Sequence, residues 1–137
     1  MRHVAALLAI AVLPFLASLA AAQQPKPAAS AQELMKSVVI PASDVVFGVG
    51  KAAPKTDKEW TAVQDGAARL SDAAKQLERL APPANGANWI KQSRAMADAA
   101  ETAGKAAKTK NADAVLDAGD VLYSTCENCH KQFMKNR

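Results

Sequence analysis

Both cysteines of this 137-residue chain, and one of its two histidines, lie within five residues of one another in the stretch STCENCHKQF (124–133). Two residues separate Cys126 from Cys129, and His130 follows directly. Cys-x-x-Cys-His is the attachment signature of haem c, because each thiol can add to one vinyl group and the neighbouring imidazole can ligate the iron. Residues three apart in a helix share a face, so both thiols can reach one haem. We therefore predict one covalent haem c per chain, with His130 as the proximal iron ligand.

The same three residues are compatible with other chemistry, which the sequence disfavours but leaves open. A thiol–disulfide redox pair usually opens a helix beside a strand, and no alternation of strands and helices is visible here. A structural zinc site would need a fourth ligand and normally pairs two ligand clusters. A disulfide inside an intact helix is disfavoured by its geometry. A catalytic cysteine would want a separate orienting Asn or Asp, which the sequence does not identify.

The N-terminal residues 1–22 have the pattern of a secretory signal peptide: Arg2 comes first, an apolar run follows, and three alanines precede Gln23. Pro14 interrupts the apolar run, which is shorter than the roughly 20 residues that a membrane-spanning helix needs. We therefore predict cleavage rather than a membrane anchor. Residues 23–137 would then form one domain in the periplasm, and His3 would be removed with the signal peptide.

The composition of the chain favours helices over strands and argues against a nucleic-acid partner. Half of the residues are hydrophobic, but only 4% are aromatic, and alanine is far commoner than the β-branched residues that suit strands. The formal net charge of +4 is small and scattered along the chain.

Caps and breaks divide the chain into four helices. Ser30 with Glu33, and Thr56 with Glu59, have the spacing of capping boxes. Pro41 should bend the first helix, because proline lacks an N–H and clashes with the preceding turn. The other breaks and starts are Gly48 and Gly50, the stretch LAPPANG (80–86), and Asn111, which can cap the last helix.

Within these helices, apolar residues recur at steps of three and four, the seam of a helix bundle. We predict an all-α fold, an antiparallel up-down-up-down four-helix bundle with haem c attached near the end of the last helix. The last seam runs through Val115, Ala118, Leu122, Cys126, Cys129 and Phe133. Small residues on the later helices would either let helices approach closely or leave room for a cofactor.

A signal peptide, four helices and Cys-x-x-Cys-His within ten residues of the C-terminus resemble the class II c-type cytochromes, the cytochrome c′ family. The resemblance covers the whole mature chain, whereas class I cytochromes c carry the motif near their N-terminus. Phe133 matches an aromatic residue that the family tends to have three residues after its haem histidine. Met134 stands where the family often has an arginine. The role of that arginine near the haem edge would have to be taken by Lys131 or Lys135, or it is absent from this chain.

The resemblance also implies that the second axial position decides the function. With an apolar residue there, such proteins are five-coordinate and bind nitric oxide or carbon monoxide; with methionine, they are low-spin electron carriers. Met134 lies one turn beyond His130 on the same helix, and Met96 is expected in the core. Met35 is the candidate distal ligand, because the first helix should start at the end of the bundle where the last one finishes, and low-spin relatives take their methionine from there. Leu34 is the alternative residue, which would leave the position open.

We therefore expect a one-electron carrier rather than an enzyme, with a five-coordinate gas-binding protein and a haem-free thiol oxidoreductase as alternatives. Its partners would be redox proteins, membrane-bound ones included, and Lys131, Lys135 and Arg137 could orient an acidic partner. The same lysines suit a solvated helix end equally well. A homodimer is compatible with the resemblance, since cytochrome c′ relatives often pair through their first two helices.

Overall fold

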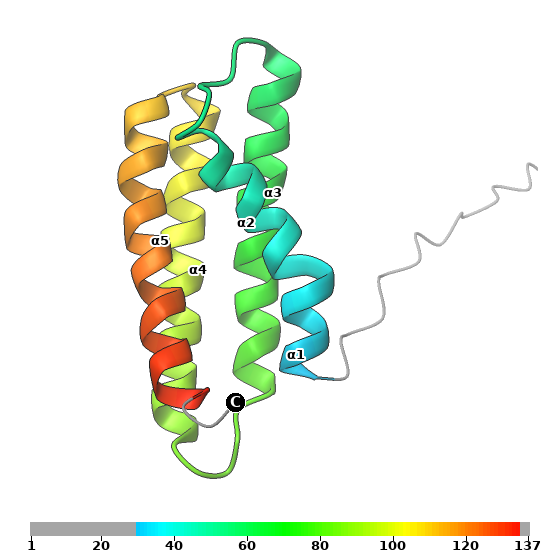
Figure 1. Ribbon diagram of the computed structural model, residues 1–137, viewed down its shortest axis with the longest axis vertical. Coiled ribbons are helices and arrows are strands. Elements are labelled where there is room, and N and C mark those ends of the chain that lie inside the picture. Colours follow the sequence, from blue (N-terminus) through cyan, green and yellow to red (C-terminus); the bar gives the residue numbers. More distant parts are fainter. Residues whose placement is uncertain (1–29, 135–137) are drawn as a thin grey trace, which may run out of the picture.

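The computed structural model describes residues 30–134, and every regular element in that range is helical. The first helical segment consists of α1 (Ala31–Leu34), the π-helical turn η1 (Met35–Val39) and α2 (Ile40–Gly48). It is followed by α3 (Asp57–Arg79), α4 (Gly86–Lys108) and α5 (Ala112–Phe133). The four segments lie side by side along the long axis of the molecule (Figure 1). The prediction of an all-α protein with four packed helices is confirmed.

Several predicted features lie outside the described residues. These are the signal peptide (1–22), with His3 and Pro14, the segment 23–29, and the C-terminal residues 135–137, with Lys135 and Arg137. Among residues 30–134, none of the helices combines the length and the hydropathy that crossing a membrane requires.

The helix starts follow the predicted caps. The Ser30 hydroxyl accepts a hydrogen bond of 3.1 Å from the third amide of the first segment. At the start of α3, Thr56 and Glu59 form the complete capping box, with bonds of 3.2 Å and 2.8 Å in opposite directions. The Asn111 side chain caps α5 through a bond of 3.0 Å. These side chains satisfy amides that have no partner within their own helix.

The bend expected at Pro41 takes the form of a π turn just before it. In η1 the Ile40 N–H donates to the carbonyl of Met35, five residues back, instead of four. A proline at position 41 has no N–H to offer the carbonyl of Ser37, and its ring would clash with that carbonyl in a regular helix. The wider π turn avoids the clash by taking in one extra residue.

The core is built mainly from the α3–α4 and α4–α5 contacts, with α2 packed on α3 and, more lightly, on α5. Its most enclosed side chains include Leu70, Val115 and Leu122, and small residues fill much of the rest. A Cβ added at Gly104 would lie 3.4 Å from the Cβ of Ala67, so the small residues bring α3 and α4 close together. Of the two roles expected for the alanine-rich seams, close approach is the one found between these two helices.

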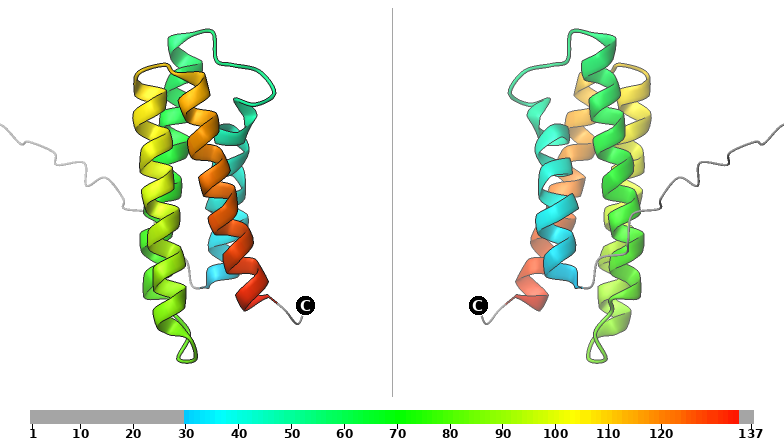
Figure 2. Two further views of the ribbon diagram at one scale, coloured as in Figure 1. Left: turned by 90° about the vertical axis from the view of Figure 1, so that its left-hand side faces the viewer. Right: turned by 90° about the vertical axis from the view of Figure 1, so that its right-hand side faces the viewer.

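The beginning of α1 and the end of α5 lie at the same end of the molecule in all three ribbon views (Figures 1 and 2). This arrangement brings the segment that contains Met35 and the segment that contains the two cysteines to one end of the fold.

Candidate functional site

The last two turns of α5 carry the three residues of the Cys-x-x-Cys-His motif. Both cysteines are free thiols and half-buried, whereas His130 is exposed. Cys129 lies seven residues after Leu122, which in turn lies seven after Val115; both of these are fully buried. Seven residues are close to two helical turns, so the thiols continue the core-facing side of α5 toward its end.

The two thiols are held in their neutral form. Burial raises the pKa of Cys126, against a smaller opposing effect of its hydrogen bond with Thr125. Burial also raises the pKa of Cys129, and the neighbouring Cys126 raises it further. Redox-active and nucleophilic cysteines usually have lowered pKa values and lie at helix N-termini. This pair lies near a C-terminus, where the helix dipole disfavours a thiolate.

Trp89 anchors the end of α5 to the rest of the bundle. Its ring meets Phe133 edge to face, with centroids 5.0 Å apart. Its indole N–H donates a bond of 2.6 Å to the carbonyl of Leu77, in the last turns of α3. Trp89 is half-buried, whereas Trp60 is in the core with 6% exposure. The turn that carries the cysteines is therefore fixed to both α3 and α4.

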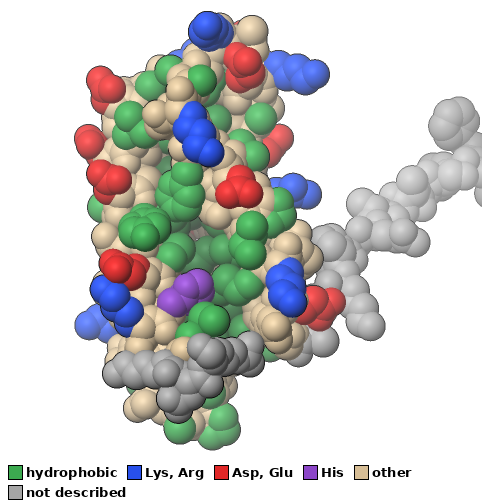
Figure 3. Space-filling view, viewed as in Figure 1, with side chains coloured by type: hydrophobic (Ala, Val, Ile, Leu, Met, Phe, Trp, Pro, Cys, Tyr) green, Lys and Arg blue, Asp and Glu red, His purple; other side chains and the backbone are tan. Residues whose placement is uncertain are grey.

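Contacts with α2 show which side of α5 faces the first segment. The rings of Phe47 and Tyr123 meet edge to face at 6.4 Å, and Phe47 also lies against Gly119. His130 follows Tyr123 by seven residues, so its imidazole lies on the same side of α5. Figure 3 shows hydrophobic side chains gathered between α5 and the first segment, with the imidazole in purple among them. We call this surface, which Phe47, Tyr123 and His130 line, the α2/α5 face.

The methionines occupy different environments. Met96 is 5% exposed, which confirms its predicted place in the core. Met134 is 46% exposed beyond the end of α5. Met35 is half-buried and packs against the core, whereas its neighbour Leu34 is 1% exposed and enclosed on all sides.

Sequence reasoning missed the contribution of Phe47 and Tyr123 to this surface. Tyr123 is the single tyrosine of the chain, and its spacing of seven residues from His130 was a usable signal. Phe47 had no such signal, because its partner lies on a helix distant in sequence. Lys131, proposed as a partner-orienting charge, forms an ion pair of 2.8 Å with Glu127 on its own helix.

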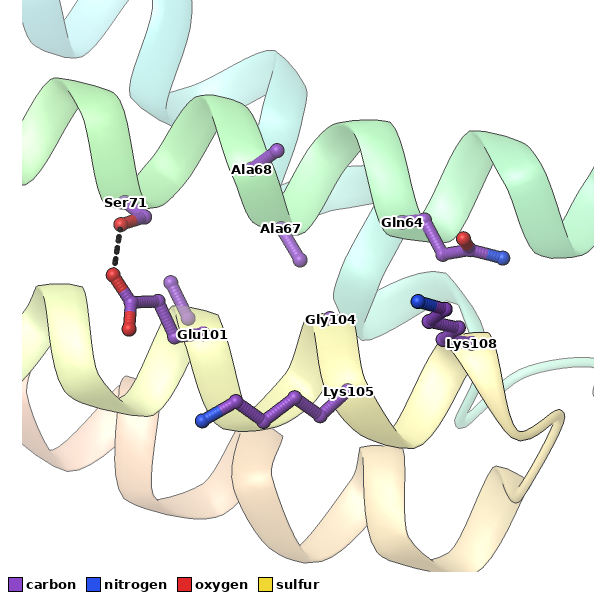
Figure 4. Close-up of a pocket in the computed structure, with 9 residues that line it drawn as sticks. Gln64, Ala67, Ala68, Ser71, Glu101, Gly104, Lys105 and Lys108 are labelled. Atoms are coloured by element: carbon purple, nitrogen blue, oxygen red, sulfur yellow. Dashed lines mark hydrogen bonds between the residues drawn. The ribbon is translucent and has the colours of Figure 1, made fainter.

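A separate groove of about 370 Å³ lies between α3 and α4 (Figure 4). Its lining comes from those two helices only and includes Ala67, Gly104 and Lys108. Across it, the Ser71 hydroxyl donates a bond of 3.1 Å to the Glu101 carboxylate. The groove contains none of the motif residues, so it is distinct from the candidate site.

Within residues 30–134, no three side chains of His, Cys, Asp or Glu converge as a set that could hold a metal ion. Comparison with known proteins found no matching family model, no matching curated protein and no matching solved structure.

Proposed function

We propose that this chain is an exported c-type cytochrome that carries one electron, built like the class II cytochromes on an up-down-up-down bundle. Its haem would be bound covalently to Cys126 and Cys129, with His130 and Met35 as axial ligands. The observation that carries the proposal is the placement of the motif. Two free, half-buried thiols and an adjacent imidazole lie at the end of α5, and the imidazole is on the α2/α5 face.

The residues present fit a haem at this place. The two cysteines are free of any disulfide, so each S–H could add across one vinyl group to give a thioether, with the sulfur bonded to one vinyl carbon and the proton on the other. Aromatic and aliphatic side chains, Phe47 and Tyr123 among them, offer an apolar surface beside the imidazole. When bound, the haem would supply a one-electron Fe(III)/Fe(II) couple, tuned by the axial ligands and by burial.

The difference in burial favours Met35 over Leu34 as the residue that faces the distal side of the iron. Leu34 is enclosed by protein atoms, so its side chain has no free surface to present to an iron. Met35 keeps part of its surface free while packing against the core at the same end of the fold as His130. A thioether at this position gives the six-coordinate form expected of an electron carrier rather than the five-coordinate, gas-binding form.

The thiol oxidoreductase alternative is less well supported. Such an enzyme needs one thiolate of low pKa, and burial raises the pKa of both thiols here. It also needs the pair at the start of a helix, and the pair lies in the last turns of α5.

The proposal includes export to the periplasm and redox proteins as partners. The apolar N-terminal run followed by three alanines supports export. A test of export is N-terminal sequencing of the protein from a periplasmic fraction, which should start at or near Gln23. A chain that retains Met1 in the cytoplasmic fraction would contradict it.

The test of the function is made on protein matured in cells that carry a haem-attachment system. We expect a positive pyridine haemochrome assay and a mass equal to the processed polypeptide plus one haem. The visible spectrum of the reduced protein should be low-spin and unchanged by carbon monoxide. A high-spin spectrum that shifts with the gas would support the gas-binding function instead. Colourless protein of bare polypeptide mass would overturn the proposal altogether.

A further inference from the structure

The π turn η1 changes the direction in which the first residues of the chain point. Its hydrogen bond from Ile40 to Met35 spans five residues, so the turn holds one residue more than a regular α-helical turn. Each residue rotates the direction of an α-helical side chain by about 100°. An extra residue therefore rotates the side-chain directions of all the residues that precede it by about 100° relative to α2.

The side of α2 that faces α5 is defined by direct contacts. Phe47 touches Tyr123 and lies against Gly119, both on α5. Ile40 precedes Phe47 by seven residues, close to two turns, and so lies on nearly the same side of the helix. This side is the reference for the residues that precede the π turn.

Because the π turn holds five residues, Met35 lies one turn before Ile40 and on nearly the same side of the helix, the side that faces α5. Leu34 then falls on the side that faces the core. The exposures agree with this phase, because Leu34 is 1% exposed and Met35 is half-buried. In a regular α-helix of the same sequence, Met35 would point into the core and Lys36 would point toward α5.

We propose that the π turn before Pro41 is the device that turns Met35 toward His130, because it keeps Met35 on the same side as Ile40 although five residue steps separate the two. This inference rests on the proposed function, in which Met35 is an iron ligand. Pro41 favours the π turn because it offers no N–H to Ser37 and its ring would clash with that carbonyl. Burial of Leu34 favours the same phase. The residues of η1 and Pro41 are thus positioning residues, which act through Met35.

The test removes the extra residue and leaves Met35 on the same side of the helix as Ile40. Deletion of Ser37 together with Pro41→Ala leaves four steps between Met35 and Ile40, the spacing of a regular α-helical turn. Ser37 is exposed, and its hydroxyl donates a hydrogen bond of 2.8 Å to the carbonyl of Glu33. We expect the shortened protein to keep the low-spin spectrum and to ignore carbon monoxide. A high-spin spectrum that responds to the gas would mean that the deletion rotated Met35 away, and would overturn the inference.

A second pair of variants keeps the length of the chain. It tests the direction of the side chains at positions 35 and 36 even if the deletion variant fails to fold. Met35→Leu should give a high-spin protein that binds carbon monoxide. Adding Lys36→Met to that variant moves the thioether one residue along, where the π turn points it away from α5. The double variant should therefore stay high-spin. Recovery of the low-spin spectrum would show that position 36 faces the iron, as in a regular helix, and would overturn the inference.

These experiments distinguish a failure of the proposed function from a failure of the role of the π turn. An unchanged spectrum in Met35→Leu would remove Met35 from the proposed function. A high-spin Met35→Leu protein combined with a rescued double variant would leave the thioether ligation standing and remove only the role of the π turn.

Discussion

Trp89 and Phe133 meet edge to face, with ring centroids 5.0 Å apart and ring planes inclined by 77°. Trp89 stands near the start of α4 and Phe133 is the last residue of α5, so the contact joins the two helices where the motif lies. The indole N–H of Trp89 adds a bond to the Leu77 carbonyl, on α3. Three helices thereby hold the segment that carries the cysteines.

Trp89→Phe should weaken this anchor without removing it. The phenyl ring keeps the contact with Phe133, but the carbonyl of Leu77 loses the indole donor. We expect a loss of about 1 kcal/mol in the free energy of unfolding, the usual worth of one such bond. Denaturant unfolding followed by circular dichroism measures it, with Tyr123→Phe as the control at an exposed aromatic. Equal stability of Trp89→Phe and the natural protein would show that the bond contributes nothing.

Leu34→Ala should cost stability and leave the haem spectrum alone. Leu34 is 1% exposed, and removing a leucine side chain from such an environment leaves a cavity. We expect a loss of about 3 kcal/mol in the free energy of unfolding. The reduced spectrum of the folded protein should stay low-spin, because Met35 is untouched. A high-spin spectrum in this variant would show that Leu34 and not Met35 controls the distal position.

Met35→Ala, unlike Leu34→Ala, should change the haem spectrum. We expect the low-spin spectrum to become high-spin and carbon monoxide to bind promptly, because the Met35 side chain no longer supplies a sulfur ligand to the iron. Absorption spectra of the reduced protein with and without the gas measure both effects. Met96→Leu is the matched control, since Met96 is buried in the core and should leave the spectrum unchanged. If both variants keep the natural spectrum, the ligand is another group.

Replacing the two cysteines should separate attachment from ligation. Cys126→Ala with Cys129→Ala should give a chain whose mass equals that of the processed polypeptide after denaturation, because no thioether can form. Each single variant should retain one thioether and a mass that includes haem. Mass spectrometry under denaturing conditions measures the mass of each of the three variants. Haem that stays covalently bound to the double variant would contradict the assignment of the two thiols.

The capping box at the start of α3 should make stability depend on pH. The backbone N–H groups of Lys55 and Thr56 donate to the Glu59 carboxylate and hold its pKa below the ordinary value of 4.5. A carboxyl whose pKa is lowered by folding stabilises the protein above its unfolded pKa, and this contribution disappears as pH falls through the lowered value. We therefore expect stability from Glu59 at pH 7 that is lost in acid.

Glu59→Gln is the matched variant, because glutamine keeps the shape and cannot titrate. The natural protein should have the higher melting temperature at neutral pH, and the difference should shrink as the pH is lowered well below 4.5. Melting curves of both proteins, recorded by circular dichroism at neutral and strongly acidic pH, give the comparison. A difference that stays constant across this range would refute the role of the Glu59 charge.

Much of the local structure was readable from the sequence because it depends on neighbours along the chain. Ser30, Thr56 and Asn111 cap helices through side-chain bonds that span three residues, so their spacing alone identified them. The motif in α5 is likewise local, since its three residues need only a shared helix to act together. Met96 was placed in the core by helical periodicity, and its exposure agrees.

The tertiary structure decided what depends on contacts between distant segments. The hydrogen bond of Trp89 to Leu77 and its ring contact with Phe133 join residues from three helices. Periodicity alone could not separate Leu34 from Met35, because it assumes a regular helix. The π turn breaks that regularity, and only the packed structure shows that the Leu34 side chain is enclosed and that the Met35 side chain keeps a free surface. A hydrogen-bond register is fixed by the whole fold, and so is the direction of every side chain that precedes it.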